Sequence, residues 1–216
     1  DNAHGEYLAF LDADDFFFDK DAIERMVAAS RENKVSVCGS YRKELRNGKV
    51  IDTDFMRDFV MPGTKGTLVS FEDYQFDFFF QCFLYNHELI AANNIRFKEY
   101  MRYEDPPFLL KALDLAKCFY AIPVVLHCYR KGHKDRKGNI PFLPDSLRGL
   151  RDNLVYAEEH NYTKLFRILI GRLIWMYREE IMQNKSLELK NVLDEIDDIF
   201  HRNVNSEFSF SFDVND

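Results

Sequence analysis

The stretch that decides the fold runs from Gly5 to Asp15 and reads GEYLAFLDADD. Its centre, Tyr7-Leu8-Ala9-Phe10-Leu11, is a continuous apolar run, which is typical of a short strand buried on both faces. The carboxylates Asp12, Asp14 and Asp15 follow directly, and helical spacing of apolar residues begins a few residues later. The pattern predicts a buried strand, an acidic turn and then a helix, as in α/β proteins.

The acidic turn is a candidate cation site. Asp12 and Asp14 flank one residue, so at the end of a strand both side chains can turn toward one point. Clustered carboxylates repel one another, and a divalent cation removes that cost. Hard oxygen ligands suit Mg²⁺ or Mn²⁺, which also hold substrate phosphates. The alternative, which the string by itself leaves open, is a solvated acidic loop that caps the following helix.

A second acidic pair, Glu104 and Asp105, precedes Pro106-Pro107. Proline is tolerated in the first turn of a helix, so the pair is predicted to lie at a helix amino terminus. An anionic carboxylate is stabilised there, and it suits a general base that can reach a hydroxyl group. Plain helix capping is the alternative.

A basic segment follows the next predicted strand. That strand runs from Phe119 to Tyr129, broken by Pro123, and Arg130 ends it. The following residues, which include His133, are mostly basic and form a loop that would bind a pyrophosphate. A solvated loop without a ligand is equally compatible with this pattern.

The remaining patterns divide the chain into two parts, 1–140 and 141–216. Further elements expected in the first part are a helix from Asp19 or Asp21, a strand over 35–41, an Asn47-Gly48 hairpin turn, an aromatic-rich helix from Phe71 to about Phe80, a strand over 82–85 and a helix over 88–93. After Pro144 the pattern is wholly helical, over 145–160, 163–184 and 187–201.

Composition narrows the classes of function. The chain has 216 residues, a formal net charge of −7 and 46% hydrophobic residues, which is typical of a globular protein. An acidic chain is a poor general binder of phosphate backbones, so no nucleic acid partner is expected. The four cysteines form no CxxC pair, and no apolar run is long enough to span a membrane. We therefore expect a cytoplasmic protein with reduced thiols.

Taken together, the motifs resemble those of a known enzyme family. Gly5 to Asp15 resembles the DxD segment of inverting glycosyltransferases of family two, which have the GT-A fold. The segment from Leu89 to Phe97, followed by Glu104-Asp105, resembles the acceptor side and its "ED" motif, and Tyr129-Arg130 resembles the aromatic-arginine pair that closes the domain. The resemblance implies an α/β fold: a partial GT-A, Rossmann-like mixed sheet flanked by helices, followed by a carboxyl-terminal helical segment.

The resemblance also implies roles on the donor side. Asp12 would contact the ribose or base side of a nucleotide-sugar donor. Asp14 would ligate Mn²⁺ or Mg²⁺, with Asp15 as a supporting residue or an alternative ligand. Arg130 and His133 would lie over the pyrophosphate.

On the acceptor side, Asp105 would be the base that deprotonates an acceptor hydroxyl, and Glu104 would help to place it. The implied reaction transfers a sugar with inversion to a saccharide or lipid-linked acceptor. Cell-surface polysaccharide synthesis at the inner face of the membrane is the setting that the family suggests.

The amino terminus departs from the family pattern. Family members have several βα units before the DxD strand, and this chain starts almost at that strand. We therefore expect an incomplete donor site, and the alternative function is a catalytically incomplete fragment that binds a sugar or a partner. The exposed sheet edge would favour a homo-oligomer or a covering loop.

The helix predicted over 163–184 has two interpretations. Between Arg167 and Arg178 it mixes bulky apolar residues with Arg172 and the two flanking arginines. This composition would suit peripheral contact with a membrane surface. A core helix packed on its neighbours is the alternative.

Overall fold

The computed structural model describes residues 2–52, 66–132, 140–184 and 186–203. The chain divides into two compact units, which are treated separately below. The first unit comprises Asp1–Tyr74, Phe79–Arg96 and Lys111–Asp135. The second comprises Gln75–Phe78, Phe97–Leu110 and Arg136–Asp216.

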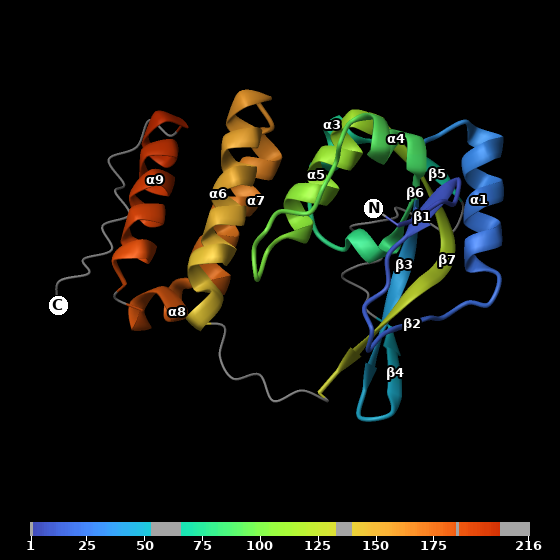
Figure 1. Cartoon of the computed structure of the whole chain (residues 1–216), viewed down its shortest axis with the longest axis horizontal. Coiled ribbons are helices and arrows are strands. Elements are labelled where there is room, and N and C mark those ends of the chain that lie inside the picture. The colour runs from blue at the N-terminus through green and yellow to red at the C-terminus, as the bar shows by residue number, and fades with distance from the viewer. Residues whose placement is uncertain (1, 53–65, 133–139, 185, 204–216) are drawn as a thin grey trace. The chain divides into compact units, whose positions relative to one another are not determined.

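A mixed sheet forms the centre of the first unit (Figure 1). Its strand order is β1-β6-β3-β7-β2, while β4 pairs with β3 and β5 pairs with β7. The β3–β7 pair is parallel, and the other described pairs are antiparallel. The strands are β1 (Tyr7–Ala9), β2 (Phe16–Phe17), β3 (Val37–Arg46), β4 (Lys49–Asp52), β5 (Thr67–Ser70), β6 (Phe83–Asn86) and β7 (Cys118–Lys131). The expectation of a mixed sheet flanked by helices is confirmed.

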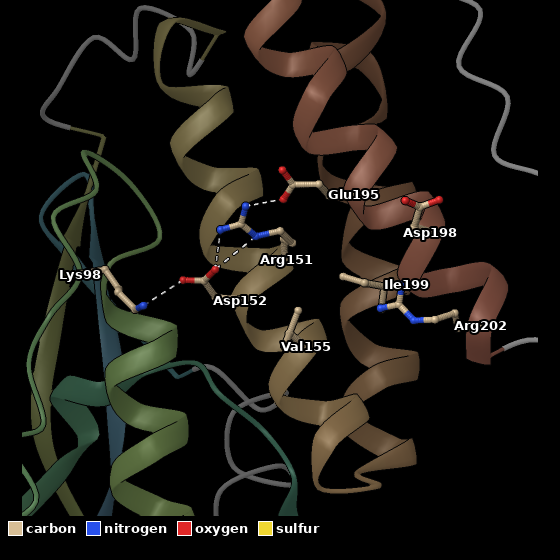
Figure 2. Close-up of a pocket in the computed structure, with 8 residues that line it drawn as sticks. All are labelled: Lys98, Arg151, Asp152, Val155, Glu195, Asp198, Ile199 and Arg202. Carbon is tan, nitrogen blue, oxygen red and sulfur yellow. Dashed lines mark hydrogen bonds and ion pairs between the residues drawn. The ribbon is translucent and has the colours of Figure 1, made fainter.

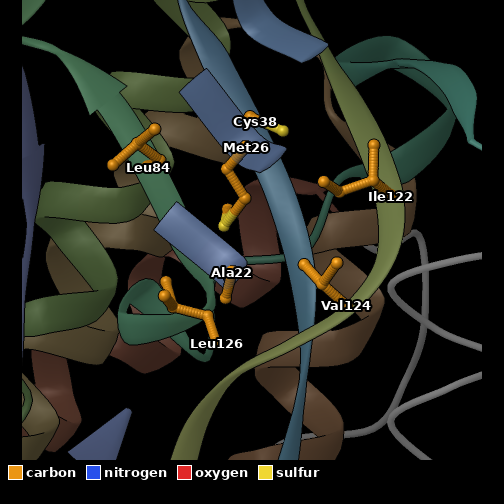
Figure 3. Packing of buried hydrophobic residues seen from close by; sticks show 7 residues of the cluster. All are labelled: Ala22, Met26, Cys38, Leu84, Ile122, Val124 and Leu126. Carbon is orange, nitrogen blue, oxygen red and sulfur yellow. The ribbon is translucent and has the colours of Figure 1, made fainter. Parts of the chain in front are cut away.

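Helix α1 (Ala22–Asn33) packs its apolar face on this sheet. Ala22 and Met26 are four residues apart and therefore lie on one face of the helix. Both are buried in a cluster with side chains from β3, β6 and β7 (Figure 3). The cluster consists of Ala22, Met26, Cys38, Leu84, Ile122, Val124 and Leu126. The cluster fixes α1 against the sheet.

Short helical elements complete the first unit. They are α3 (Phe71–Tyr74), η1 (Phe80–Cys82) and α4 (His87–Ala92). Only the second half of helix α5 (Asp105–Ala116) belongs to the first unit, because the division between the units falls between Leu110 and Lys111. All four cysteines are free, as the sequence predicts.

Strand β7 is continuous through Pro123, so the predicted break there is wrong. Pairing with β5 ends at Ala121, and pairing with β2 begins at His127. The register with β3 also shifts between these two points. Proline donates no backbone hydrogen bond, and here it is exposed where β7 changes neighbours, so no ladder bond is lost.

Three further local expectations can be compared with the structure. The Asn47-Gly48 hairpin is confirmed, with both residues at positive φ (50° and 76°) between Arg46 and its partner Lys49. The aromatic helix predicted from Phe71 to about Phe80 is wrong, because α3 ends at Tyr74. Gln75 and Phe79 then adopt positive φ, which a helix does not allow. Strand β1 is only half-buried, against the expectation of burial on both faces.

The second unit is helical. Its elements are η2 (Ile140–Phe142), α6 (Leu143–Glu159), α7 (Thr163–Met176), α8 (Arg178–Gln183) and α9 (Leu187–Asn203), and α6 packs against both α7 and α9. The predicted helices are present, except that the one over 163–184 is divided at Tyr177 into α7 and α8. This unit includes the chain from Arg136 onward together with two earlier segments.

Ion pairs connect the helices of this unit. Asp152 of α6 accepts from Lys98 at 3.1 Å and from Arg151 at 2.7 Å, and Arg151 also pairs with Glu195 of α9 (Figure 2). Tyr100 donates a further bond to Asp152 at 3.0 Å. Lys98, Arg151, Asp152 and Glu195 line a shallow pocket. Their charged groups pair with one another, which indicates a structural role. No helix among the described residues is long and apolar enough to cross a membrane.

Candidate donor and acceptor sites

The acidic turn after β1 is closed by its own backbone, since the amide of Asp15 donates to the carbonyl of Asp12 at 3.1 Å. Asp12 is exposed, and its Oδ2 accepts from Nε2 of Gln81 at 3.2 Å. Asp14 is half-buried on the same turn. The turn therefore presents two carboxylates at the edge of the first unit while Asp15 points inward.

Asp15 holds the turn against the end of β7. Its Oδ2 lies 2.7 Å from Nε2 of His127, and its Oδ1 accepts from the backbone amide of Arg130 at 2.8 Å. Nε of Arg130 donates in turn to the carbonyl of Asp14 at 2.9 Å. These three contacts, which we call the Asp15 clamp, fix both the position of Asp14 and the direction of Arg130.

His127 is neutral at neutral pH. Burial lowers its pKa, and the opposing effect of Asp15 does not restore it. The neutral ring then donates from Nε2 to Asp15, while Nδ1 is buried and has no hydrogen-bond partner among the described residues. His127 lies within the strand predicted over 119–129, and its pairing with Asp15 was not predicted because the two residues are 112 positions apart.

Positive charge accumulates where the parallel strands β3 and β7 end. Glu44 is buried, and its carboxylate accepts from Arg42 at 3.0 Å, Lys131 at 2.8 Å and Arg46 at 2.8 Å. Burial alone would raise the pKa of Glu44, but Lys131 and Arg46 lower it overall, so Glu44 is ionised. One carboxylate thus organises three cations, and the surplus favours an anionic ligand in this region.

Two aromatic rings lie close to the guanidinium of Arg42. Its guanidinium lies 4.4 Å from the ring centre of Phe79 and 5.2 Å from that of Tyr129. Nothing local in the sequence predicts this cluster, because its members come from β3, β7 and the segment before η1. Side chains alternate between the two faces of a strand, so residues 42, 44 and 46 of β3 lie on one face. This alternation was the available sequence signal for the part of the cluster that β3 supplies.

The acidic pair on the acceptor side belongs to the second unit. Asp105 is the first residue of α5 and Glu104 directly precedes it, and both are half-buried. Their predicted place at a helix amino terminus is confirmed. His133, the remaining predicted donor contact, lies outside the described residues.

Among the described residues no group of three or more His, Cys, Asp or Glu side chains is arranged to hold a metal ion. Mg²⁺ typically uses one or two carboxylates together with substrate phosphates, and the exposed turn with Asp12 and Asp14 fits that kind of site.

Comparison with solved structures identifies the fold. The structure of S. aureus TarS 1-349 in complex with UDP-GlcNAc matches with a TM-score of 0.64 at 17% identity, covering 92% of this chain and 58% of that chain. The complex of the same fragment with UDP matches with a TM-score of 0.63 at 17% identity, covering 91% and 57%. The chain therefore has the GT-A glycosyltransferase fold, and it spans little more than half the length of those fragments.

A family model matches the amino-terminal part of the sequence. Residues 1–92 match the sequence model described as Glycosyl transferase family 2. The matched segment contains Asp12, Asp14 and Asp15. A comparison with curated proteins gave no match.

Proposed function

We propose that the chain belongs to an enzyme that transfers a sugar from a nucleotide-diphospho-sugar to an acceptor hydroxyl with inversion. The observation that carries the proposal is the Asp15 clamp, which holds Arg130 next to Asp14, and Asp14 lies within the segment that matches the family 2 model. The bound UDP-GlcNAc and UDP of the TarS structures support a nucleotide-sugar donor.

Asp14 is proposed to ligate Mn²⁺ or Mg²⁺, and Asp12 to contact the ribose or base side of the donor. A bound divalent cation supplies positive charge that stabilises the leaving diphosphate. Both oxygens of Asp15 accept hydrogen bonds from His127 and Arg130. Of the two roles expected for Asp15, we therefore favour support of Asp14 over direct ligation.

Positive side chains are proposed to hold the diphosphate. Arg130 is fixed by the Asp15 clamp, and its exposed guanidinium is available to a negatively charged ligand. The cations around Glu44 add a favourable potential on the same unit. His133 is proposed to assist from the loop that follows β7.

Asp105 is proposed as the general base. It takes the proton of the acceptor hydroxyl while the acceptor oxygen forms a bond to the anomeric carbon and the bond from that carbon to the diphosphate breaks. Attack from the face opposite the leaving group inverts the centre, and no covalent intermediate on the enzyme is needed. Glu104 would help to place Asp105.

The proposed acceptor is a saccharide or a lipid-linked saccharide in cell-surface polysaccharide synthesis, handled at the cytoplasmic face of the membrane. Trp175, Met176 and Met182 are exposed around the junction of α7 and α8. Arg167 and Arg178 are also exposed and form no ion pair within the described part of the chain. We propose that the 163–184 segment contacts the membrane through this surface.

One of the three arginines of that segment is buried, against the expectation for a membrane-facing helix. Arg172 is only 6% exposed, so it does not contribute to a membrane-facing surface. The core interpretation of α7 holds for this side of the helix.

Self-association through the sheet edge stays a prediction, since within the described residues β1 pairs with β6 alone.

The test is a thermal-shift titration with UDP, GDP, CDP and dTDP, each with and without Mn²⁺. Ligands that bind only the native state raise the melting temperature, by an amount that reports affinity. We expect a Mn²⁺-dependent shift with one nucleotide and none after Asp14→Asn. Glu24→Gln, an exposed change on α1, is the matched control. No shift with any nucleotide would favour the alternative, a fragment that binds a sugar or a partner without catalysis.

A further inference from the structure

A buried ionic network occupies the interior of the second unit. Nη2 of Arg172 lies 2.6 Å from Oδ1 of Asp77, whose side chain has no exposed surface. The other oxygen of Asp77 accepts from Nδ2 of Asn153 at 2.6 Å. Burial alone would lower the pKa of Arg172, but Asp77 and Tyr103 raise it, so the guanidinium is charged.

Aromatic rings enclose the same guanidinium. Its central carbon lies 3.4 Å from the ring centre of Phe78 and 5.4 Å from that of Phe76. The remaining arm, Nη1, donates to the hydroxyl of Tyr103 at 2.7 Å. Burial raises the pKa of Tyr103 well above its ordinary value, and Asp77 raises it further, so the hydroxyl is neutral. Arg172 therefore joins the 75–78 segment and α7 to Tyr103.

Tyr103 has a strained backbone directly before the acidic pair. Its φ is 65°, a left-handed conformation that is uncommon for a bulky residue. Strain of this kind persists where surrounding contacts hold it, and it concentrates at functional sites. The next two residues are Glu104 and Asp105, so the direction in which α5 begins depends on how Tyr103 is held.

A second contact also restrains Tyr103. Gly149 of α6 lies so close that a Cβ atom there would be 2.7 Å from the Tyr103 carbonyl oxygen and 2.8 Å from its ring. Tyr103 is thus in contact with both the backbone of α6 and the guanidinium of Arg172. Asp105 also lies within electrostatic reach of this interior, because it contributes to the raised pKa of buried Tyr177.

We propose that Arg172 is a positioning residue for Asp105, acting through the hydroxyl and backbone of Tyr103. The assignment deepens the proposed function, on which it rests for the role of Asp105 as base. Stability alone is a poor reason for such a network, because a buried ion pair is often no more stabilising than apolar residues of the same volume. A fixed geometry at the start of α5 is what the network provides.

Tyr103→Phe is the test variant, since it removes the one oxygen that Arg172 holds in this segment. Tyr100→Phe is the matched control. Tyr100 lies three residues before Tyr103, and its hydroxyl also donates a hydrogen bond, to Asp152. The readout is the ¹³Cγ carboxyl resonance of Asp105, assigned with Asp105→Asn. We expect Tyr103→Phe to move this resonance and Tyr100→Phe to leave it in place. An unmoved resonance in folded Tyr103→Phe overturns the inference.

Gly149→Ala provides an independent displacement of Tyr103, with Gly171→Ala of α7 as its control. A Cβ at Gly171 meets only a Trp175 atom at 4.0 Å. We expect the Asp105 resonance to move in Gly149→Ala and not in Gly171→Ala. If Gly149→Ala does not fold, Tyr103→Phe still decides the outcome.

Turnover separates this inference from the proposed function. With UDP-GlcNAc as the probe donor and release of UDP as the signal, we expect Tyr103→Phe to lower kcat about 10- to 100-fold with little change in the KM for the donor. If the resonance moves but Asp105→Asn has the turnover of the unmodified chain, the role of Asp105 as base is wrong while its attachment to Arg172 stands. If Asp105→Asn lowers kcat and Tyr103→Phe does not, the inference alone fails.

Discussion

Asp15 and His127 form a hydrogen bond of 2.7 Å across 112 residues of sequence, and both side chains are buried in the first unit. The pair joins the turn after β1 to the end of β7. It therefore determines where Asp14 lies, although neither residue needs to touch a substrate.

Asp15→Asn is expected to destabilise the chain and weaken the donor site together. An amide has one acceptor oxygen where the carboxylate has two, so the contact to His127 or to the Arg130 amide is lost. A buried hydrogen bond to a charged group contributes about 1–3 kcal/mol to the free energy of unfolding. Urea unfolding measures this loss, and the Mn²⁺-dependent nucleotide shift is expected to shrink. An unchanged shift would mean that the clamp does not position Asp14.

Asp105→Asn is expected to lower kcat by about 10²- to 10⁴-fold, the range for loss of a general base. Glu104→Gln, its neighbour on the same turn, is expected to have a smaller effect. Nucleotide affinity is expected to be the same in both variants, because neither carboxylate is proposed to contact the donor. Steady-state rates and a nucleotide titration check the two statements. Equal losses of kcat in the two variants would contradict the assignment of the base to Asp105.

Stability is expected to fall in acid, in part through Asp152. Burial alone would raise its pKa, but Arg151, Lys98 and Tyr100 lower it overall below the ordinary 3.8. A group with a depressed native pKa contributes stability above its unfolded value, and this stability is lost as pH falls through 3.8 toward the native value. Asp152→Asn should therefore flatten the dependence of the unfolding free energy on pH below about 5. A slope identical to that of the unmodified chain would contradict this prediction.

Trp175 gives a direct test of membrane contact, because it is the single tryptophan of the chain and is 86% exposed. Vesicles with anionic lipid are expected to shift its emission to shorter wavelength as the indole enters the interface. Arg167→Gln and Arg178→Gln should each weaken vesicle binding by about 1 kcal/mol, or roughly five-fold. Arg172 is buried, so it is not expected to contribute to vesicle binding. Unshifted emission and no co-sedimentation would exclude this surface.

The local features of both sites could be predicted from the sequence. The acidic turn follows an apolar run, and the Glu104-Asp105 pair precedes two prolines, so neighbouring residues carry all the information. Contacts between distant segments carry no such local signal. The contact between His127 and Asp15 was therefore not predicted, and Arg172 was interpreted as one of three cations on a helix.

Aromatic composition and proline misled the prediction in two places. The residues after Tyr74 are as apolar as a buried helix requires, yet Gln75 and Phe79 turn the chain with positive φ. Pro123 suggested a broken strand. Whether a strand tolerates proline depends on which strands flank it at that point, and this is a contact between distant segments. Hydrophobic pattern reports burial, and it does not report the path that the backbone takes to achieve it.

Strand β7 also sets the order in which the chain can fold. It pairs with β2, β3 and β5, all of which precede it in sequence. Strand β3 can pair with β4 and β6 before β7 is made, but within the described residues β2 and β5 have no other strand partner until residues 118–131 emerge. The sheet therefore cannot be completed until its last strand is present. Contacts of long sequence separation form slowly, and unpaired strands are prone to aggregate in the interval. The first unit is therefore expected to fold only after its last strand is made, and truncation before Cys118 would leave earlier strands without the partner that joins them.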